Sequence, residues 1–274
     1  MKIAVLSDIH GNLPALQRVA DHIEQWQADQ VIVNGDIVNR GPLSAACWEF
    51  VQAQGWAVVS GNHEAYVASW LDPQTIRTGP EFEINQSSFW TFQRLNGIVE
   101  VLLRLPARLS LVGPDAGEVR LTHGSMRGNR DGIYPFTTDE ELRHKIEPPP
   151  AVFISGHTHK PLIRYVDQTL VLNVGSAGCT FDGDARASYG QLVWGSGRWS
   201  ATIIRLDYDR HQTDQDFHQS GFFEGGPLAY LMYLEWRNAA NNINGWIQRY
   251  EAHVLAGEIT LADSVARYRA EMGL

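Results

Sequence analysis

Short apolar runs that stop at a polar residue recur along the first part of the chain. Five of them have the length of a buried strand and predict a sheet: residues 2–6, 31–33, 57–59, 119–121 and 151–154. Between the first three runs, residues 13–27 and 43–54 have apolar side chains at helical spacing, and Asn12 before Pro14 is typical of a helix start. The order β-α-β-α-β predicts a parallel beginning with right-handed crossovers.

The middle of the chain, residues 64–105, has a less regular helical pattern that is rich in aromatic side chains. These are Trp70, Phe82, Phe89, Trp90 and Phe92. They either form a helix core or overhang a site and stack on a planar substrate group. Their helical spacing favours the core.

The pattern changes again in the last third of the chain. Residues 170–174 and 189–206 predict strands of a second sheet packed on the first, with a tight turn at Gly195-Ser196-Gly197. Residues 211–222 are polar and predict a loop, whereas 228–255 and 260–272 predict helices.

These patterns divide the chain into a main domain over residues 1–207 and a helical extension over residues 208–274. The helices of the extension are rich in Tyr, Trp and Leu and therefore need a surface to cover. Packing on the main domain and pairing with a second copy in a homodimer both satisfy that need, and the sequence leaves both open.

Side chains that can bind metals follow all five apolar runs. They are Asp8, His10, Asp36, Asn62, His63, His123, His157 and His159. Because the carboxyl ends of parallel strands meet at one edge of a sheet, we expect these side chains to lie close together. One metal ion takes three or four protein ligands, so the set is too large for one ion and fits two. Imidazole nitrogen suits transition metals.

Composition narrows the class of protein. The chain has 274 residues, is 44% apolar and has a formal charge of −9, which argues against non-specific nucleic-acid binding. No apolar stretch approaches the length of a membrane span, and the N-terminal residues lack the features of an export signal. The two cysteines form no disulfide framework, so we expect a cytoplasmic protein.

The polar strand ends form motifs in a fixed order. These are Asp8-x-His10, Gly35-Asp36, Gly61-Asn62-His63-Glu64, His123-Gly124 and Gly156-His157-Thr158-His159. This set resembles the calcineurin-like metallophosphoesterase family. The segment 173–178 is also similar to a strand and turn of its small bacterial members. The resemblance implies two mixed sheets packed as a sandwich and flanked by helices, an α-β-β-α fold, with a two-metal site at the sheet edge.

The resemblance also implies roles for individual residues. One metal would be held by Asp8, His10 and His159, a second by Asn62, His123 and His157, and Asp36 would bridge them. The ions would be Mn, Fe, Ni, Co or Zn, and a bridging hydroxide would attack phosphorus. His63 would protonate the leaving group and Arg40 would bind the phosphate, with Arg127 as a second anion contact.

One position departs from the family pattern. Asn39 stands where protein phosphatases of this family have an aspartate that orients the acid histidine. We expect its amide to accept an N–H from His63 without the help that a carboxylate gives in raising the pKa. The Glu64 side chain could either orient His63 or face solvent, and we favour solvent.

The resemblance predicts an enzyme that hydrolyses phosphodiesters or phosphomonoesters of a small, nucleotide-like substrate. Alternatives within the fold are a protein serine/threonine phosphatase and a dinucleoside-polyphosphate hydrolase. A third is a non-catalytic scaffold that binds metals. A scaffold is expected to have lost ligands or the acid histidine, and here all are present, which favours the enzyme.

Overall fold

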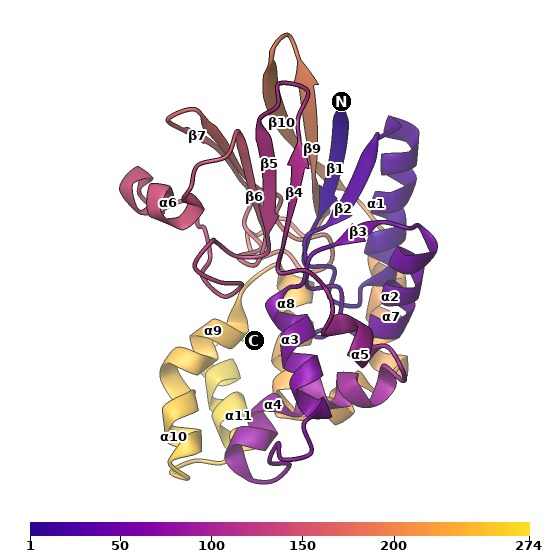
Figure 1. The fold of residues 1–274 in the computed structure, drawn as a ribbon. Coiled ribbons are helices and arrows are strands. Elements are labelled where there is room, and N and C mark those ends of the chain that lie inside the picture. Colours follow the sequence, from indigo (N-terminus) through magenta and orange to yellow (C-terminus); the bar gives the residue numbers. More distant parts are fainter.

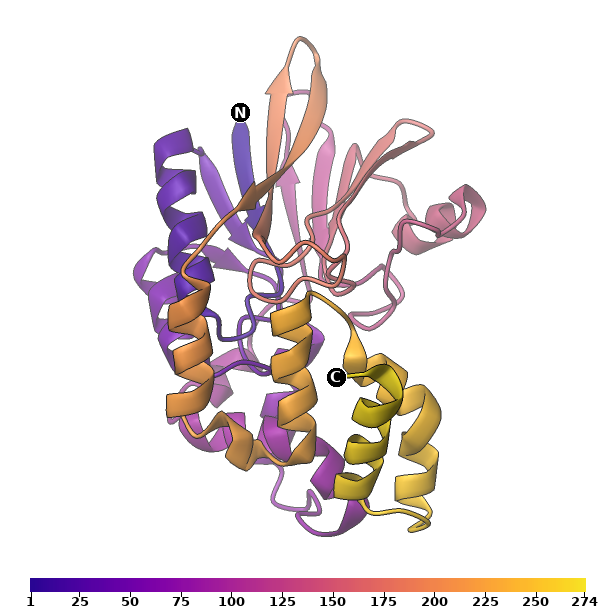
Figure 2. The same ribbon diagram turned by 180° about the vertical axis from the view of Figure 1, so that it is seen from behind.

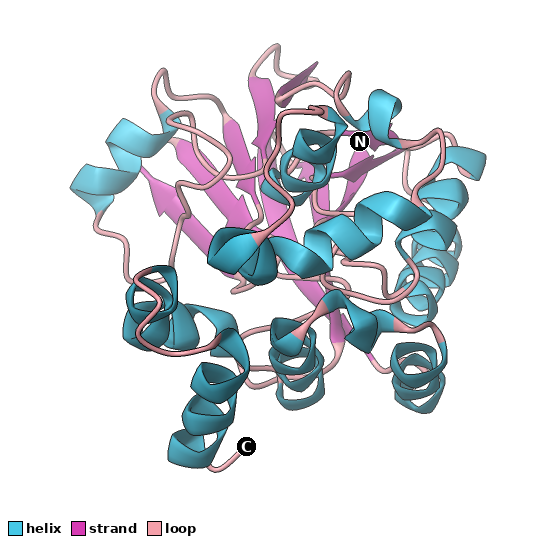
Figure 3. Ribbon diagram, turned by 90° about the horizontal axis from the view of Figure 1, so that it is seen from below, coloured by secondary structure: helices cyan, strands magenta, loops and turns pink.

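Two five-stranded sheets lie face to face, with helices on their outer faces and a layer of helices across one end (Figures 1 and 3). The computed structural model describes residues 1–274. In sheet order, the first sheet is β10 (Arg198–Leu206), β9 (Ala187–Gly195), β1 (Lys2–Leu6), β2 (Gln30–Val33) and β3 (Ala57–Val58). The second is β4 (Arg108–Val112), β5 (Glu118–Thr122), β6 (Val152–Ser155), β8 (Thr169–Asn173) and β7 (Leu162–Val166). Both sheets mix parallel and antiparallel pairs, which confirms the predicted fold class.

Strand β1 shows why the strands have nearly unbroken apolar sequences. Its side chains alternate between two cores, because successive residues of a strand point to opposite faces. Ile3 and Val5 lie in the core between the sheets, whereas Ala4 and Leu6 lie in the core under the outer helices. A strand covered on both faces needs apolar residues at every position.

Helices cover the outer faces of both sheets. Helices α1 (Leu13–Trp26) and α2 (Ser44–Ala53) pack on the first sheet, and α6 (Asp139–Ile146) packs on the second. The predicted start of α1 is confirmed, because the Asn12 side chain accepts the Ala15 N–H at 3.2 Å.

The remaining helices form the layer beneath the strand ends (Figures 1 and 2). From the middle of the chain come α3 (Asn62–Ala68), a 3₁₀ turn (Ser69–Leu71), α4 (Gly79–Arg94) and α5 (Val99–Leu102). From the extension come α7 (Arg210–Gln219), a 3₁₀ turn (Phe222–Gly225), α8 (Pro227–Asn238), α9 (Asn242–Trp246), a π-helical turn (Ile247–Glu251), α10 (Ala252–Leu255) and α11 (Leu261–Met272). No helix of the structure has both the length and the apolar character that crossing a bilayer demands.

The placement of one predicted hairpin was wrong. Strands β9 and β10 do not join the second sheet but extend the first, where β9 runs antiparallel to β1. Both faces of β9 are covered, because Leu192 lies between the sheets and Tyr189 lies in the core on the α1 side. The apolar alternation of a strand is the same in either sheet, so the pattern does not choose between them.

Two predictions for the extension were also wrong. Residues 210–219 form a helix, since Asp209 caps its first turn at Gln212 and Phe217 is buried. The continuous helix predicted over residues 228–255 is broken after α8, where Ala239 adopts a left-handed conformation and Asn241 caps the next helix.

The extension packs on the main domain through an aromatic core. Its members from the extension include Phe217, Trp236 and Trp246, which share one cluster with Trp90 of α4 and with Phe181 from the loop before β9. The extension therefore covers a surface of its own chain, and the homodimer stays a prediction.

Candidate metal centre

The side chains that follow β1, β2, β3, β5 and β6 meet at one end of the two sheets. Nε2 of His159 lies 3.2 Å from Oδ1 of Asp8 and 3.2 Å from Nε2 of His10. Nε2 of His123 lies 3.0 Å from Oδ2 of Asp36. These contacts bring together residues that are up to 149 positions apart in the chain.

The donors form overlapping groups whose ligand atoms lie within 4.8 Å of one another. The groups are Asp8–His10–His159, Asp36–His123–His157 and His10–Asp36–His63. Oδ1 of Asn62 joins the second group, at 3.1 Å from Nε2 of His123 and 2.8 Å from Nδ1 of His157. All of these side chains are buried except that of His157, which is partly exposed.

The backbone at this centre is strained. Seven residues without the freedom of glycine have positive φ values between 49° and 67°: Asp8, His10, Asp36, Asn39, Arg40, His157 and His159. Such conformations are costly for ordinary residues and concentrate at functional sites. Gly61 permits one close approach, because a Cβ there would lie 2.1 Å from Oδ1 of Asp36.

Backbone carbonyl groups fix the orientation of three imidazoles. Nδ1 of His123 lies 2.8 Å from the Asn34 carbonyl oxygen, and Nδ1 of His10 lies 3.2 Å from that of Asn39. Nδ1 of His159 contacts the Cys179 carbonyl oxygen. Each Nδ1 must donate to its carbonyl, so Nε2 is the nitrogen directed at the centre, which is the arrangement of metal-binding histidines.

The donor set fits metal ions. Oδ1 of Asp8 is buried and accepts no hydrogen bond, and the Nε2 atoms of His10 and His159 face each other without an intervening donor. Burial and the nearby His159 lower the pKa of His10 to about 3, so that imidazole is neutral near pH 7. Facing lone pairs and an unpartnered carboxylate oxygen are stabilised by a cation between them.

The expectation that Glu64 faces solvent was wrong. The carboxylate is fully buried and accepts backbone N–H groups from Asp36 at 2.8 Å, Ile37 at 2.7 Å and Gly61 at 2.8 Å. Desolvation and the Asp36 charge raise the pKa of Glu64 to about 7. Glu64 therefore ties the loop after β2 to the start of α3.

Asn39 contacts His63 in the opposite sense from the one expected. Its Oδ1 accepts the Arg40 N–H at 2.9 Å and the Thr91 hydroxyl at 3.3 Å, which leaves Nδ2 facing Nδ1 of His63 at 2.9 Å. The amide therefore donates to the imidazole, which puts the proton of neutral His63 on Nε2. Burial lowers the pKa of His63 well below its usual value, and the Asp36 charge opposes that shift.

The two arginines singled out in the sequence lie in different surroundings. Arg40 is largely buried and forms an ion pair with Glu235 of α8. Arg127 lies at the surface and pairs with Glu141 at 2.6 Å, so its role as an anion contact stays a prediction. Glu235 was not among the residues predicted from the sequence, because nothing near it in the sequence marks it as part of a site.

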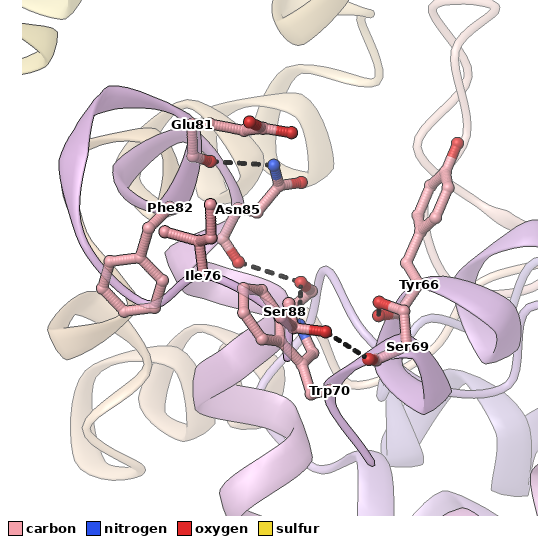
Figure 4. Close-up of a pocket in the computed structure, with 9 residues that line it drawn as sticks. Tyr66, Ser69, Trp70, Ile76, Glu81, Phe82, Asn85 and Ser88 are labelled. Carbon is pink, nitrogen blue, oxygen red and sulfur yellow. Dashed lines mark hydrogen bonds between the residues drawn. The ribbon is translucent and has the colours of Figure 1, made fainter. Parts of the chain in front are cut away.

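The aromatic residues of the middle segment pack mostly on one another. The Trp70 ring lies 5.1 Å from that of Phe89 and 5.8 Å from that of Phe82, and Trp70 is buried. Beside them is a cavity of about 340 Å³ between α3 and α4, shown in Figure 4. The Tyr66 side chain points away from the other lining residues, and no candidate metal ligand lines this cavity. The arrangement agrees with the core interpretation.

Comparisons with known proteins identify the family. The model of the calcineurin-like phosphoesterase superfamily domain matches residues 1–193. The phosphodiesterase YfcE of Escherichia coli K12 is 26% identical over 194 residues, which cover 70% of this chain and 87% of that protein. A symmetrical bis(5′-nucleosyl)-tetraphosphatase from Erwinia tasmaniensis is 37% identical over 70 residues, which cover 24% of this chain and 26% of that protein.

A similar architecture is found in a crystal structure. The metallophosphoesterase from Sphaerobacter thermophilus has a TM-score of 0.68 at 24% identity, and the match covers 88% of this chain and 99% of that one. The chain belongs to the calcineurin-like phosphoesterase superfamily. Its relatives support the hydrolysis of phosphoesters, in a family that typically binds divalent metals.

Proposed function

We propose that this protein is a two-metal phosphoesterase acting on a small, nucleotide-like substrate. The proposal is carried by one observation: two complete groups of donors share one buried centre. The group Asp8–His10–His159 and the group Asp36–His123–His157 are adjacent, since Oδ2 of Asp36 also lies 3.8 Å from Nε2 of His10. A carboxylate within reach of both groups is suited to bridging two ions, which is the role we assign to Asp36.

The chemistry follows from this donor set. Two divalent ions bound there would lower the pKa of a water molecule and screen the charge that develops on the phosphate. We assign His63 to the leaving group, because it stands beside the centre and is not needed for coordination. We assign Arg40 to a phosphate oxygen, because a guanidinium forms directional, charge-assisted hydrogen bonds with phosphate.

The substrate class is inferred from burial and from the relatives. Almost every donor is buried, and the helical layer lies across the strand ends, which favours a small ester over a protein loop or a polymer. YfcE is a phosphodiesterase, and we extend diester hydrolysis to this chain as the first candidate. Hydrolysis of a dinucleoside polyphosphate is the second candidate, favoured by the short, more similar match to a symmetrical tetraphosphatase.

Steady-state kinetics with added metals tests the proposal. The metal-free chain is supplied with Mn²⁺, Ni²⁺, Zn²⁺ or Fe²⁺ and assayed on an activated aryl phosphodiester, the matching monoester and diadenosine tetraphosphate. We expect metal-dependent turnover and a clear preference for one substrate. Bound metal with no turnover of any of the three would favour a metal-binding scaffold instead.

A further inference from the structure

A buried ion pair joins the helical extension to the loop that carries Arg40 beside the candidate centre. Nη2 of Arg40 contacts Oε2 of Glu235, which is 195 positions away in α8. The Glu235 side chain is 0% exposed and the Arg40 side chain 12% exposed. In Figures 1 and 2, α8 lies directly beneath the strand ends, where the loop with Arg40 also lies. A buried carboxylate and guanidinium in contact restrict each other strongly, since either one alone would be costly to bury.

Glu235 is held by the extension on its other side. Its Oε1 accepts the Ile243 N–H from α9 at 2.7 Å, so both carboxylate oxygens have fixed partners. The next residue, Trp236, donates from Nε1 to the Tyr208 hydroxyl at 2.7 Å. The same hydroxyl accepts from Asn12 at 3.2 Å, two residues after the candidate ligand His10. The position of Glu235 is therefore fixed relative to the centre itself.

The guanidinium of Arg40 retains donors for a ligand. Its Nε is buried and has no partner, while Glu235 occupies only Nη2. The guanidinium carbon lies 5.6 Å from the Phe181 ring, which in turn stacks on His159 with centroids 4.1 Å apart. Arg40 therefore stands beside a candidate metal ligand with an unused buried donor, an arrangement that points to an anion.

We propose that Glu235 is the positioning residue for Arg40, so that the helical extension completes the phosphate-binding side of the centre. The inference rests on the proposed function and adds a functional role for a segment beyond the region that the family model matches. Glu235 holds Nη2 of the guanidinium so that the unpartnered Nε is presented to a phosphate oxygen. Loss of Glu235 leaves Arg40 free to turn toward the carboxylates of the centre.

The test compares Glu235→Gln with wild type on the metal-loaded full chain. Phosphate affinity is measured by calorimetry with inorganic phosphate, and KM and kcat are measured with the aryl phosphodiester. The variant should weaken the charged hydrogen bond between Arg40 and phosphate, so we expect the affinity for phosphate to fall about tenfold. KM should rise by the same factor, and kcat should change little. Glu235→Asp should recover part of the affinity, because it keeps the charge but retracts it from Arg40.

Two further variants separate positioning from a general structural effect. In an Arg40→Met background, Glu235→Gln should have no further effect on phosphate binding, since it acts through Arg40. Glu271→Gln is the matched control, because Glu271 also lies in the extension and pairs with Arg249 at the surface. We expect it to behave as wild type.

The outcomes distinguish this inference from the proposed function. Wild-type phosphate affinity in Glu235→Gln, or an equal loss with and without Arg40, would overturn the role of Glu235. If Glu235→Gln does not fold, wild-type affinity in Glu235→Asp would overturn it. A wild-type chain that neither binds phosphate nor turns over any ester would overturn the proposed function, and this inference with it.

Discussion

The buried carboxylate of Glu64 accepts the backbone N–H of Asp36 at 2.8 Å, so a residue outside the donor set holds the candidate bridging ligand in place. The same carboxylate accepts the Gly61 N–H, one residue before Asn62. One side chain thus fixes the backbone beneath candidate ligands from two different strand ends. Groups that orient metal ligands in this way typically affect metal binding as strongly as some ligands do.

Glu64→Gln is therefore expected to weaken metal binding by about 10- to 100-fold. The amide keeps one acceptor oxygen but sets an NH₂ group against backbone donors, which destabilises the loop that carries Asp36. Metal titration of the purified variant measures the change. Glu100→Gln, on the exposed face of α5, is the control. Wild-type metal affinity in Glu64→Gln would contradict this role.

His63→Ala is expected to lower kcat for an alkyl phosphodiester by about 10²- to 10⁴-fold, the usual contribution of a general acid. For an aryl ester kcat should fall less, because its leaving group needs little protonation. Metal content should be unchanged. Loss of metal together with activity would show that His63 is a ligand, as its presence in the group His10–Asp36–His63 allows.

Asn39→Asp is expected to strengthen the acid role of His63. One carboxylate oxygen can keep the contacts of the present Oδ1 with Arg40 and Thr91, while the other accepts a hydrogen bond from Nδ1–H of His63. A carboxylate there favours the imidazolium and raises the pKa of His63. The alkaline limb of the pH–rate profile for an alkyl ester should shift to higher pH. An unchanged limb would argue against an acid role for His63.

Metal binding near pH 7 is expected to release at least one proton per chain, the one carried by His123. Burial alone would lower the pKa of His123, but the carboxylates of Asp36 and Asp8 raise it to about 10 in the metal-free chain. His10 and His157, with pKa values of about 3 and about 4, have no proton to release. Calorimetry in buffers of different ionisation enthalpy measures the proton count, and a count near zero would contradict the charged state of His123.

The raised pKa of His123 also makes the stability of the metal-free chain depend on pH. Because the folded pKa of His123 lies above the unfolded value of 6.5, its stabilising contribution is complete below pH 6.5. That contribution is lost as the pH rises toward 10. Thermal unfolding measured between pH 6.5 and 10, with and without metal, detects this loss of stability.

Most of the candidate centre could be predicted because each candidate ligand stands within a few residues of the end of an apolar run. The position of Asp8 after residues 2–6, or of His157 after residues 151–154, depends only on strand geometry and on where parallel strands end. The sandwich fold followed from the resemblance carried by those same motifs. Both rest on short motifs, and the residues within each motif are close together in sequence.

The parts that could not be predicted depend on contacts between distant segments. Glu64 looks like an exposed acid at a helix start until the loop after β2 is folded over it. Glu235 lies in an apolar helix, and only its contact with Arg40 reveals its importance. The β9–β10 hairpin has a pattern that fits either sheet. Pattern alone contains no information on such pairings.

Metal content of wild type and Asp36→Asn, measured on folded protein by plasma mass spectrometry, tests whether Asp36 bridges two metal ions. We predict about two transition-metal ions per wild-type chain, a marked loss in the variant, and a parallel loss of phosphodiester hydrolysis. Thermal unfolding of the metal-free proteins establishes that the variant is folded. Full metal retention with full activity in Asp36→Asn would contradict the bridging role and, with it, the two-metal centre as drawn.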